Sequence, residues 1–369
     1  MRAVVYGVVL RVAVLSWRAP GDPDAGGSEL HSREILSRWT ADGVEVTLHA
    51  RHAPDDTVLG RGCPFDVVPV GSTYSVFAAA PRRVIARRRR FDAVVEILNG
   101  VPFWSPLWWR GPRVVWLHHM HTEMWSQTLP RPVSDIGRWN ESTVVPRVYR
   151  STPVVTLAET GRAELRHAGF GRVEVIEPGV DERFNRGDSF PAPESSRLVA
   201  VGRLAPVKRW FALLEAVAPL ADRRPGLTLD LVGDGPERSA IEEWAQRRDA
   251  RWLTVHGHVD DETLVDLYRR ATLVVSASSA EGWGMTITEA ARCGVPSVVT
   301  DVLGHRAAVI DGVTGDLVTT PADLAGAIER LLDDADRRDR YGRAAMERAH
   351  AMTWDRAANR HLELLRGCL

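Results

Sequence analysis

Short runs of β-branched residues alternate with amphipathic stretches along the chain, and one polar, proline-containing segment at residues 187–196 interrupts the series. Before this break the pattern predicts a buried strand at residues 12–17, a helix at 28–39 and a strand at 44–49. After it, the alternation restarts with a strand at 198–201 and a helix at 208–221. Such alternation is typical of parallel sheets covered by helices. The chain is therefore predicted to be α/β, with two Rossmann-like domains that bind ligands at the carboxyl ends of their strands.

The same pattern sets the expected domain limits. Further strands are predicted at residues 93–97, 114–118, 154–157, 173–176, 227–232, 253–256, 273–276 and 297–300, and further helices at 237–246, 262–269 and 354–365. We expect residues 1–186 to form the first domain and 187–351 the second.

Composition excludes several classes of protein. The 369 residues include 47 basic and 48 acidic side chains and three cysteines. A net charge of −1 argues against a nucleic-acid binder. Three scattered cysteines fit neither a disulfide framework nor a cysteine zinc site, and they suit a reducing cytoplasm. No apolar run reaches the roughly 20 residues that span a bilayer. The apolar start is interrupted by Arg11 and lacks a cleavage site, so it is interpreted as a short extension and a strand rather than a signal peptide.

Lys208 is the only lysine in the sequence, and all other basic side chains except histidine are arginine. Such a bias is expected from GC-rich coding DNA wherever a position needs only positive charge. A single remaining lysine is either an accident or a position that requires a compact ammonium.

Three segments of the second half have the composition of ligand-binding loops. Residues 200–208 (AVGRLAPVK) place Arg203 and Lys208 between a strand and the next helix, where free N–H groups favour an anion. Residues 231–236 (LVGDGP) contain Gly233 and Gly235 in a turn that lets backbone approach a flat ligand. Residues 276–289 (SASSAEGWGMTITE) contain Glu281 and Glu289, and Thr286 to Glu289 fits a capping box that starts a helix near Thr286. The dinucleotide fingerprint GxGxxG is absent from both halves.

In this order the motifs resemble the family-4 glycosyltransferases, which have the GT-B fold. The residues that carry the resemblance are Gly202-Arg203-Leu204 with Lys208, Gly233-Asp234-Gly235-Pro236, His256-Gly257-His258-Val259, Glu281-Gly282-Trp283-Gly284 with Glu289-Ala290, Gly304, and Asp311-Gly312-Val313-Thr314-Gly315. In the first half, Gly26-Gly27-Ser28-Glu29 and Pro178-Gly179-Val180-Asp181 with Phe184 also match. The resemblance covers most of the chain, and it implies that the last helix, within residues 352–369, packs back on the first domain.

The resemblance implies a role for each matching residue. Arg203 and Lys208 would bind the diphosphate of a nucleotide-sugar donor, and Glu289 would bind its ribose. The transferred sugar would be held by Glu281 and the backbone of Gly282, Trp283, Gly284, Met285 and Thr286. His258 and its neighbours would contact the base, while Gly26 and Gly27 would contact phosphate. A histidine is expected near the donor sugar; His118 fits best, and His119 is the alternative.

The implied reaction transfers a sugar from a nucleoside-diphosphate sugar to an acceptor hydroxyl on a glycan, a glycolipid or a natural-product aglycone. It would retain the anomeric configuration and use neither a metal nor another cofactor. A sugar-nucleotide epimerase, a phosphorylase and a catalytically silent binding subunit of the same fold are the alternatives. Two motifs that imitate metal sites, the His118-His119-Met120-His121 run and Asp22-Pro23-Asp24, are interpreted as a strand end and a turn.

Two further features concern the acceptor. Residues 82–90, from Arg82 to Arg90, hold six arginines and form either a solvated helix face or a peripheral contact with the anionic inner face of a membrane. Five tryptophans lie close together in the sequence, at positions 104, 108, 109, 116 and 125. We hypothesise that some of these rings, Trp108 and Trp109 above all, form an aromatic platform for the acceptor.

Overall fold

The computed structural model of the chain describes residues 9–120, 125, 130–187 and 196–369. Contacts divide it into two compact units, one comprising Met1–Gly179 with Trp354–Leu369 and the other Val180–Thr353. Residues 180–186 and 352–353, expected in the first domain, thus belong to the second unit. The reason is local bonding: Val180 N–H donates to the Met352 carbonyl at 3.0 Å, and Arg269 Nε donates to the Asn185 carbonyl at 2.7 Å.

The first unit is built on a parallel sheet, which has seven strands within the described residues, in the order β3-β2-β1-β4-β5-β6-β7. The strands are β1 (Arg11–Leu15), β2 (Glu45–Ala50), β3 (Asp66–Pro69), β4 (Ala93–Ile97), β5 (Arg113–Trp116), β6 (Pro153–Thr156) and β7 (Arg172–Val175). The middle strand of the seven is β4, and β1 lies beside it, between β2 and β4.

Helices cover both faces of this sheet. They are α1 (Gly27–Ala41), α2 (Val76–Ala86), α3 (Ser105–Trp108), α5 (Val133–Trp139), α6 (Val145–Val148), α7 (Glu159–Ala168) and α15 (Trp354–Arg366), with short 3₁₀ turns η1 (Asp56–Val58) and η2 (Arg88–Arg90) and a π-helical segment η3 (Asn140–Val144). On one face, α2 buries Val76 and Val84 in a cluster with Leu15 of β1.

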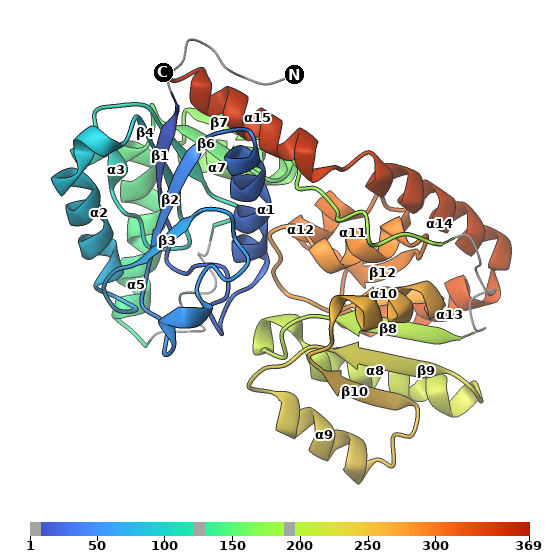
Figure 1. Ribbon diagram of the computed structural model, residues 1–369. Helices are drawn as coiled ribbons and strands as arrows, with labels where there is room; N and C mark the ends of the chain where they lie inside the picture. The colour runs from blue at the N-terminus through green and yellow to red at the C-terminus, as the bar shows by residue number, and fades with distance from the viewer. Residues whose placement is uncertain (1–8, 121–124, 126–129, 188–195) are drawn as a thin grey trace. The chain divides into compact units, whose positions relative to one another are not determined.

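The C-terminal helix α15 packs beside α1 within the first unit, as the resemblance implies (Figure 1). Trp39 Nε1 donates to the Ala358 carbonyl at 2.9 Å, and Arg38 is paired with Asp355 at 2.6 Å. The fully buried Trp39 ring anchors this pairing of the two ends of the chain.

The second unit repeats the architecture, with a parallel sheet that has six strands within the described residues, in the order β10-β9-β8-β11-β12-β13. The strands are β8 (Arg197–Val201), β9 (Thr228–Val232), β10 (Leu253–Gly257), β11 (Leu273–Ser276), β12 (Ser297–Thr300) and β13 (Gly315–Val318). The helices are α8 (Trp210–Arg223), α9 (Arg238–Arg247), α10 (Asp261–Arg270), α11 (Met285–Arg292), α12 (Leu303–Ala308), α13 (Leu324–Asp333) and α14 (Ala335–His350), with turns η4 (Pro206–Lys208) and η5 (Pro321–Asp323).

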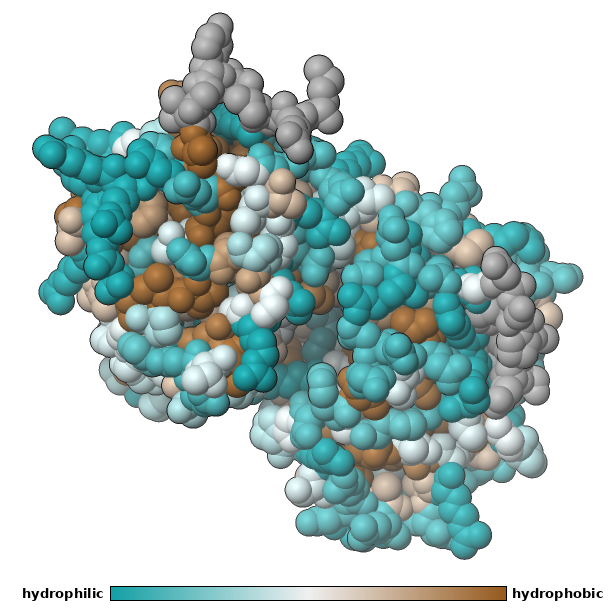
Figure 2. Space-filling model, viewed as in Figure 1, coloured by the Kyte–Doolittle hydropathy of each residue, from teal (hydrophilic) through white to brown (hydrophobic). Residues whose placement is uncertain are grey.

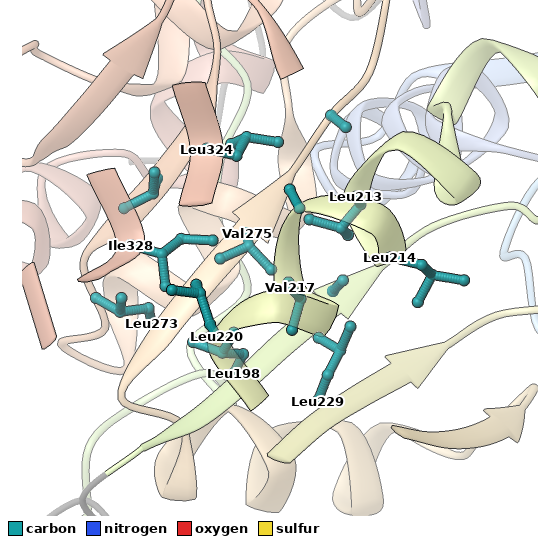
Figure 3. Close-up of a cluster of buried hydrophobic side chains, with 14 of the residues drawn as sticks. Leu198, Leu213, Leu214, Val217, Leu220, Leu229, Leu273, Val275, Leu324 and Ile328 are labelled. Atoms are coloured by element: carbon teal, nitrogen blue, oxygen red, sulfur yellow. The ribbon is translucent and has the colours of Figure 1, made fainter. Parts of the chain in front are cut away.

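The core of the second unit lies between α8, α13 and the sheet (Figure 3). Leu213, Val217 and Leu220 stand about one helical turn apart on α8, so they share one face and meet Leu198 and Val275 of the central strands. Burying a leucine or valine side chain contributes about 1.5–3 kcal/mol. This packing holds the carboxyl ends of β8 and β11, from which the candidate site is built, in fixed positions.

The helix that follows β8 starts later than predicted, and the difference affects the position of Lys208. The helix predicted at residues 208–221 begins at Trp210, because Arg209 has a left-handed backbone (φ 51°) that separates η4 from α8. Lys208 therefore ends a short 3₁₀ turn rather than starting a helix.

No described helix has the length and apolar composition needed to cross a bilayer. Figure 2 shows hydrophilic side chains over the outer edge of the first unit around α2. Arg82 and Arg87–Arg90 are exposed there, on the last turns of α2 and on η2.

Candidate active site

Loops at the carboxyl edge of the second sheet bring Lys208 and Glu281 into direct contact. Lys208, at the end of η4, forms an ion pair with Glu281 Oε1, and Ser278 Oγ donates to the same oxygen at 2.8 Å. The two loops are joined by their backbones, since Ser279 N–H donates to the Val207 carbonyl at 2.8 Å. Both charged side chains are mostly buried, with 20% and 16% of their surfaces exposed. The pair is thus a preformed cation–carboxylate site at the end of β8 and β11.

Lys208 controls the charge state of Glu281. Burial by itself raises the pKa of the Glu281 carboxyl, but the nearby charge of Lys208 and the hydrogen bonds from Lys208 and Ser278 outweigh it. The net result is a pKa below the ordinary value, so Glu281 is ionised at neutral pH. Removing the lysine would leave a mostly buried carboxylate without its cation, which is a strongly unfavourable state.

Gly233 and Gly235 allow two loops to pack backbone against backbone. A Cβ on Gly233 (φ 135°) would lie 2.0 Å from the Gly202 carbonyl oxygen, and one on Gly235 would lie 2.5 Å from the Leu204 carbonyl oxygen. Leu204 N–H also donates to the Asp234 carbonyl at 2.9 Å. The sequence suggested that these glycines let the backbone approach a ligand. In the structure they allow close contact with the loop that carries Arg203.

Glu289 lies on α11 beside Tyr268 of α10. Tyr268 Oη donates to Glu289 Oε2 at 3.2 Å, and the Tyr268 ring packs edge-on against Phe184, with 5.9 Å between ring centroids. Burial raises the pKa of Glu289 to about 7, and the negative charges of Asp261 and Asp181 add to the shift. The carboxyl is therefore poised to change charge near neutral pH, which is common for groups at functional sites.

The segment between the two glutamates differs from its predicted form. Helix α11 starts at Met285 behind Gly284, which has a left-handed backbone (φ 90°), and no side chain caps it. The predicted capping box from Thr286 to Glu289 is therefore wrong, because Glu289 bonds to Tyr268 instead. Trp283 is 3% exposed, and its Nε1–H has no acceptor within the part of the chain that the structure describes. The other predicted residues of the segment, Gly282, Met285 and Thr286, are half-buried.

Two further predicted residues of the second unit are exposed. Arg203 lies in the loop after β8, which Trp210 closes by donating Nε1–H to the Arg203 carbonyl at 3.0 Å. His258 follows β10 directly, whereas its neighbour His256 is held by Asp230 at 2.7 Å. His256 has a structural partner, and His258 stays available to a ligand.

The remaining predicted residues belong to the first unit. Gly26 caps α1, and Glu29 Oε2 accepts its N–H at 2.8 Å; Gly26 and Gly27 are both exposed at the helix start. His118 follows β5 and is 9% exposed, with its ring 4.8 Å from that of His31 between centroids. His119 is half-buried. His121 lies outside the described residues.

The aromatic stretch is packed more deeply than predicted. Trp109 is 8% exposed and donates Nε1–H to the Pro112 carbonyl at 2.9 Å, and Trp116 is 1% exposed. An acceptor platform that includes Trp109 is therefore wrong, because its ring belongs to the core under α2. Trp108 is half-buried and donates to the Phe103 carbonyl at 2.8 Å. Of Trp108 and Trp109, Trp108 has the more accessible ring.

Within the described ranges, no group of three or more histidine, cysteine or acidic side chains is arranged to hold a metal ion. Asp22 and Asp24 form a turn, as predicted, and both accept hydrogen bonds from Arg51, at 2.8 Å and 3.0 Å.

Comparison with known proteins identifies this arrangement. Residues 25–184 match the model described as "Glycosyltransferase Family 4", and residues 181–348 match "Glycosyl transferases group 1". The chain is 30% identical to "D-inositol 3-phosphate glycosyltransferase 2" of Catenulispora acidiphila, over 94% of this chain and 92% of that protein. The chain belongs to glycosyltransferase family 4. It is therefore an enzyme of the glycosyltransferase class, and the match does not favour an epimerase, a phosphorylase or a silent subunit.

Solved structures agree with the fold of this glycosyltransferase. Anabaena HepE in complex with UDP and glucose superposes with a TM-score of 0.77 at 18% identity, covering 97% of this chain and all of that one. Sucrose-phosphate synthase from Thermosynechococcus elongatus superposes with a TM-score of 0.78 at 22% identity, covering 97% and 98% of the two chains. The glycosyltransferase has the predicted GT-B fold.

Three residues at the site of the glycosyltransferase were not predicted from the sequence: Tyr268, Ser278 and His305. Tyr268 stands in a helix far from any motif, so only the folded structure brings it to Glu289. Ser278 and His305 adjoin matched motifs, three residues before Glu281 and one after Gly304. Their polar side chains beside glycine-rich segments were the available signal.

Proposed function

We propose that this glycosyltransferase binds a nucleoside-diphosphate sugar at the carboxyl edge of its second sheet and transfers the sugar to an acceptor hydroxyl. The observation that carries the proposal is the contact between Lys208 and Glu281, because the cation would bind the diphosphate and the carboxylate would hold the sugar. The N-terminus of α11, where Met285 and Thr286 are half-buried, lies next in the chain. Its free N–H groups and Arg203 add positive charge for an anion.

The chemical demand on the site is charge that develops on the departing diphosphate. As the bond from the anomeric carbon to the phosphate oxygen breaks, Lys208, Arg203 and the backbone of Gly282–Thr286 would stabilise the negative charge. Fixed groups of this kind commonly supply about 3–4 kcal/mol each. We therefore propose a metal-independent reaction, in which side chains and backbone do what a divalent ion would otherwise do.

We propose retention of configuration by attack on the face that the diphosphate leaves. The acceptor oxygen forms a bond to the anomeric carbon, the carbon–phosphate oxygen bond breaks, and the acceptor proton passes to a phosphate oxygen. No separate base is required. Glu289 would accept hydrogen bonds from the ribose hydroxyls, and His258 would contact the base. Gly26 and Gly27 would bind phosphate, and His118 would contact the sugar.

The donor proposal is tested first by thermal shift with UDP, GDP, ADP and dTDP. A nucleotide at about 100 times its Kd should stabilise the protein by about 2.7 kcal/mol. Slow donor hydrolysis without acceptor is the second measurement. We expect Lys208→Ala and Glu281→Gln to abolish it, while Glu262→Gln, an exposed glutamate of α10, leaves it unchanged. Wild-type hydrolysis in the first two variants would refute the proposed site.

The acceptor assay starts with D-inositol 3-phosphate, the compound in the name of the relative that is 30% identical. A glycolipid fraction and a set of aglycones complete the panel. Product with retained or inverted configuration is distinguished by NMR of the anomeric proton, and an inverted product would contradict the mechanism.

For a lipid-linked acceptor we propose that Arg82 and Arg87–Arg90 contact an anionic membrane. Each basic side chain near such a surface contributes about 1 kcal/mol. Arg88→Glu with Arg89→Glu should abolish sedimentation with phosphatidylglycerol vesicles, whereas Arg340→Glu with Arg343→Glu, on the exposed side of α14, should not. Equal loss in both variants would mean that net charge, rather than this surface, drives binding.

A further inference from the structure

His305 lies directly behind Glu281 and is fully buried on α12. Its Nδ1 is 2.6 Å from the Thr300 carbonyl oxygen at the end of β12. Because a carbonyl oxygen only accepts, Nδ1 carries the proton and Nε2 is left with a lone pair when the ring is neutral. Nε2 has no hydrogen-bond partner among the described residues, and it lies 4.0 Å from Glu281 Oε1.

Close packing keeps this ring at Glu281. A Cβ on Gly304 would lie 2.5 Å from the Glu281 carbonyl oxygen, and one on Gly284 would lie 3.6 Å from His305 Cδ2. Thr300 Oγ1 donates to the Ser278 carbonyl at 2.7 Å, which joins the two strand ends that carry the ring and the carboxylate. His305 therefore cannot swing away without disturbing both loops.

The charge state of His305 depends on whether Lys208 lies beside Glu281. Burial lowers the pKa of His305, Glu281 and Asp301 raise it, and Lys208 lowers it further. Asp301 is itself paired with Arg306. With Lys208 on Glu281, a neutral His305 leaves the cluster without net charge. If Lys208 were drawn to another anion, Glu281 would face a neutral ring across 4.0 Å with no cation.

This inference rests on the proposed role of Lys208 at the donor diphosphate. We propose that His305 takes up one proton at Nε2 from solvent when the donor draws Lys208 away, and that it then becomes the counter-ion of Glu281. His305 is thus a positioning residue, which acts on the sugar only through Glu281. The cluster exchanges one cation for another, so Glu281 stays ionised and in place while its lysine serves the diphosphate.

Proton uptake makes donor binding depend on pH. Affinity should increase as pH falls between the pKa of His305 in the liganded protein and its lower pKa in the free protein. Glu289 acts in the opposite direction, because its pKa of about 7 means that it releases a proton when ribose hydroxyls donate to its carboxylate. The proton released by Glu289 is the same in all variants that keep Glu289, so it cancels when their proton numbers are compared.

Two variants separate titration from structure. His305→Gln places an amide donor near the Nε2 position without a titrating group. His305→Asn keeps a donor for the Thr300 carbonyl and removes the Nε2 position. His350→Gln, an exposed histidine of α14, is the control. Calorimetric titrations at pH 7 use the nucleotide sugar that gives the largest thermal shift, in phosphate, PIPES and Tris buffers, whose ionisation enthalpies differ.

We expect wild type and His350→Gln to take up about one proton more per donor bound than His305→Gln and His305→Asn do. Equal proton numbers in all four proteins, with binding retained, would overturn the inference and leave the proposed function standing. Absence of nucleotide-sugar binding by the wild type would overturn the proposed function and this inference together.

A measurement on the wild type alone keeps the inference testable if the variants do not fold. The chain has 12 histidines. With ¹³C-labelled histidine, NMR should show one ring signal that changes from neutral imidazole to imidazolium when donor is added at pH 7. If no signal makes this change while donor saturates the protein, the inference is refuted.

Discussion

Glu289→Gln should stabilise the second unit at neutral pH while it abolishes donor binding. In the folded protein, burial raises the Glu289 pKa from 4.5 to about 7. Glutamine has nearly the same shape, and its carbonyl oxygen can still accept from Tyr268 Oη. The substitution therefore removes the cost of holding a charge there and preserves the packing of α11.

The magnitude follows from the pKa difference between the folded and unfolded chain. At 1.36 kcal/mol for each pH unit, a rise from 4.5 to about 7 corresponds to about 3 kcal/mol. Because the folded-state pKa is the higher one, the native protein binds more protons between pH 4.5 and 7, and wild-type stability falls as pH rises through this window. The difference between Glu289→Gln and wild type should be near zero at pH 4.5 and reach its full size by pH 8.

Hydrogen–deuterium exchange of peptides from α11 and β11 measures this free energy within the second unit itself. Urea unfolding of the whole chain is less suited, because two units need not unfold in one step. Glu262→Gln, on the exposed surface of α10, is the matched control and should show no pH-dependent difference. A Glu289→Gln difference that is constant from pH 4.5 to 8 would refute the argument that a buried charge is maintained here for function.

Three other substitutions test separate parts of the site. Lys208→Arg should lower donor-dependent kcat/KM by about 10²–10³-fold, the loss typical of one misplaced donor group, because a longer, planar guanidinium does not reproduce the compact ammonium that contacts Glu281. Near-normal turnover would make the lone lysine an accident. Tyr268→Phe removes a hydrogen bond that lowers the Glu289 pKa, so the loss of donor affinity on acidification should begin at higher pH than in the wild type. An unchanged pH profile of donor affinity would contradict the role of Tyr268. Trp108→Ala should raise the acceptor KM, measured by acceptor titration, with little loss of stability. Trp109→Ala should destabilise the protein by about 3–5 kcal/mol, measured by thermal unfolding. Equal effects of the two variants would refute an acceptor-binding ring at Trp108.

The alternation of β-branched and amphipathic runs was sufficient to predict both parallel sheets, whereas the return of α15 to the first unit was implied by the family resemblance. Strands β4, β11 and β12 have the predicted bounds, because each is a short apolar run that is buried on both faces. Strand β13 starts with Gly315 and Asp316, and α14 is polar along most of its length. Neither has a periodic apolar signal, so tertiary packing decides them.

Errors in the site have a common physical cause. The local rule for a capping box assigned Glu289 to a backbone N–H near Thr286, but Tyr268, more than 20 positions away in the chain, holds this carboxylate. Loop punctuation around Trp108 and Trp109 suggested exposed rings, but Pro112 and the core under α2 take up Trp109. Local patterns cannot anticipate a partner that arrives from another element.

The sequence by itself determined the α/β class, the two-part organisation, the family and the residues of the matched motifs, because short-range periodicity and motif order are written along one dimension. Only the tertiary structure decided that Lys208 meets Glu281, that Tyr268 holds Glu289, and that His305 stands behind the pair. These contacts join loops and helices that are 21 to 73 residues apart in the chain, from Tyr268 and Glu289 to Lys208 and Glu281. The lone lysine, indistinct from a coding accident in the sequence, is in the folded protein the cation on which the charge state of Glu281 depends.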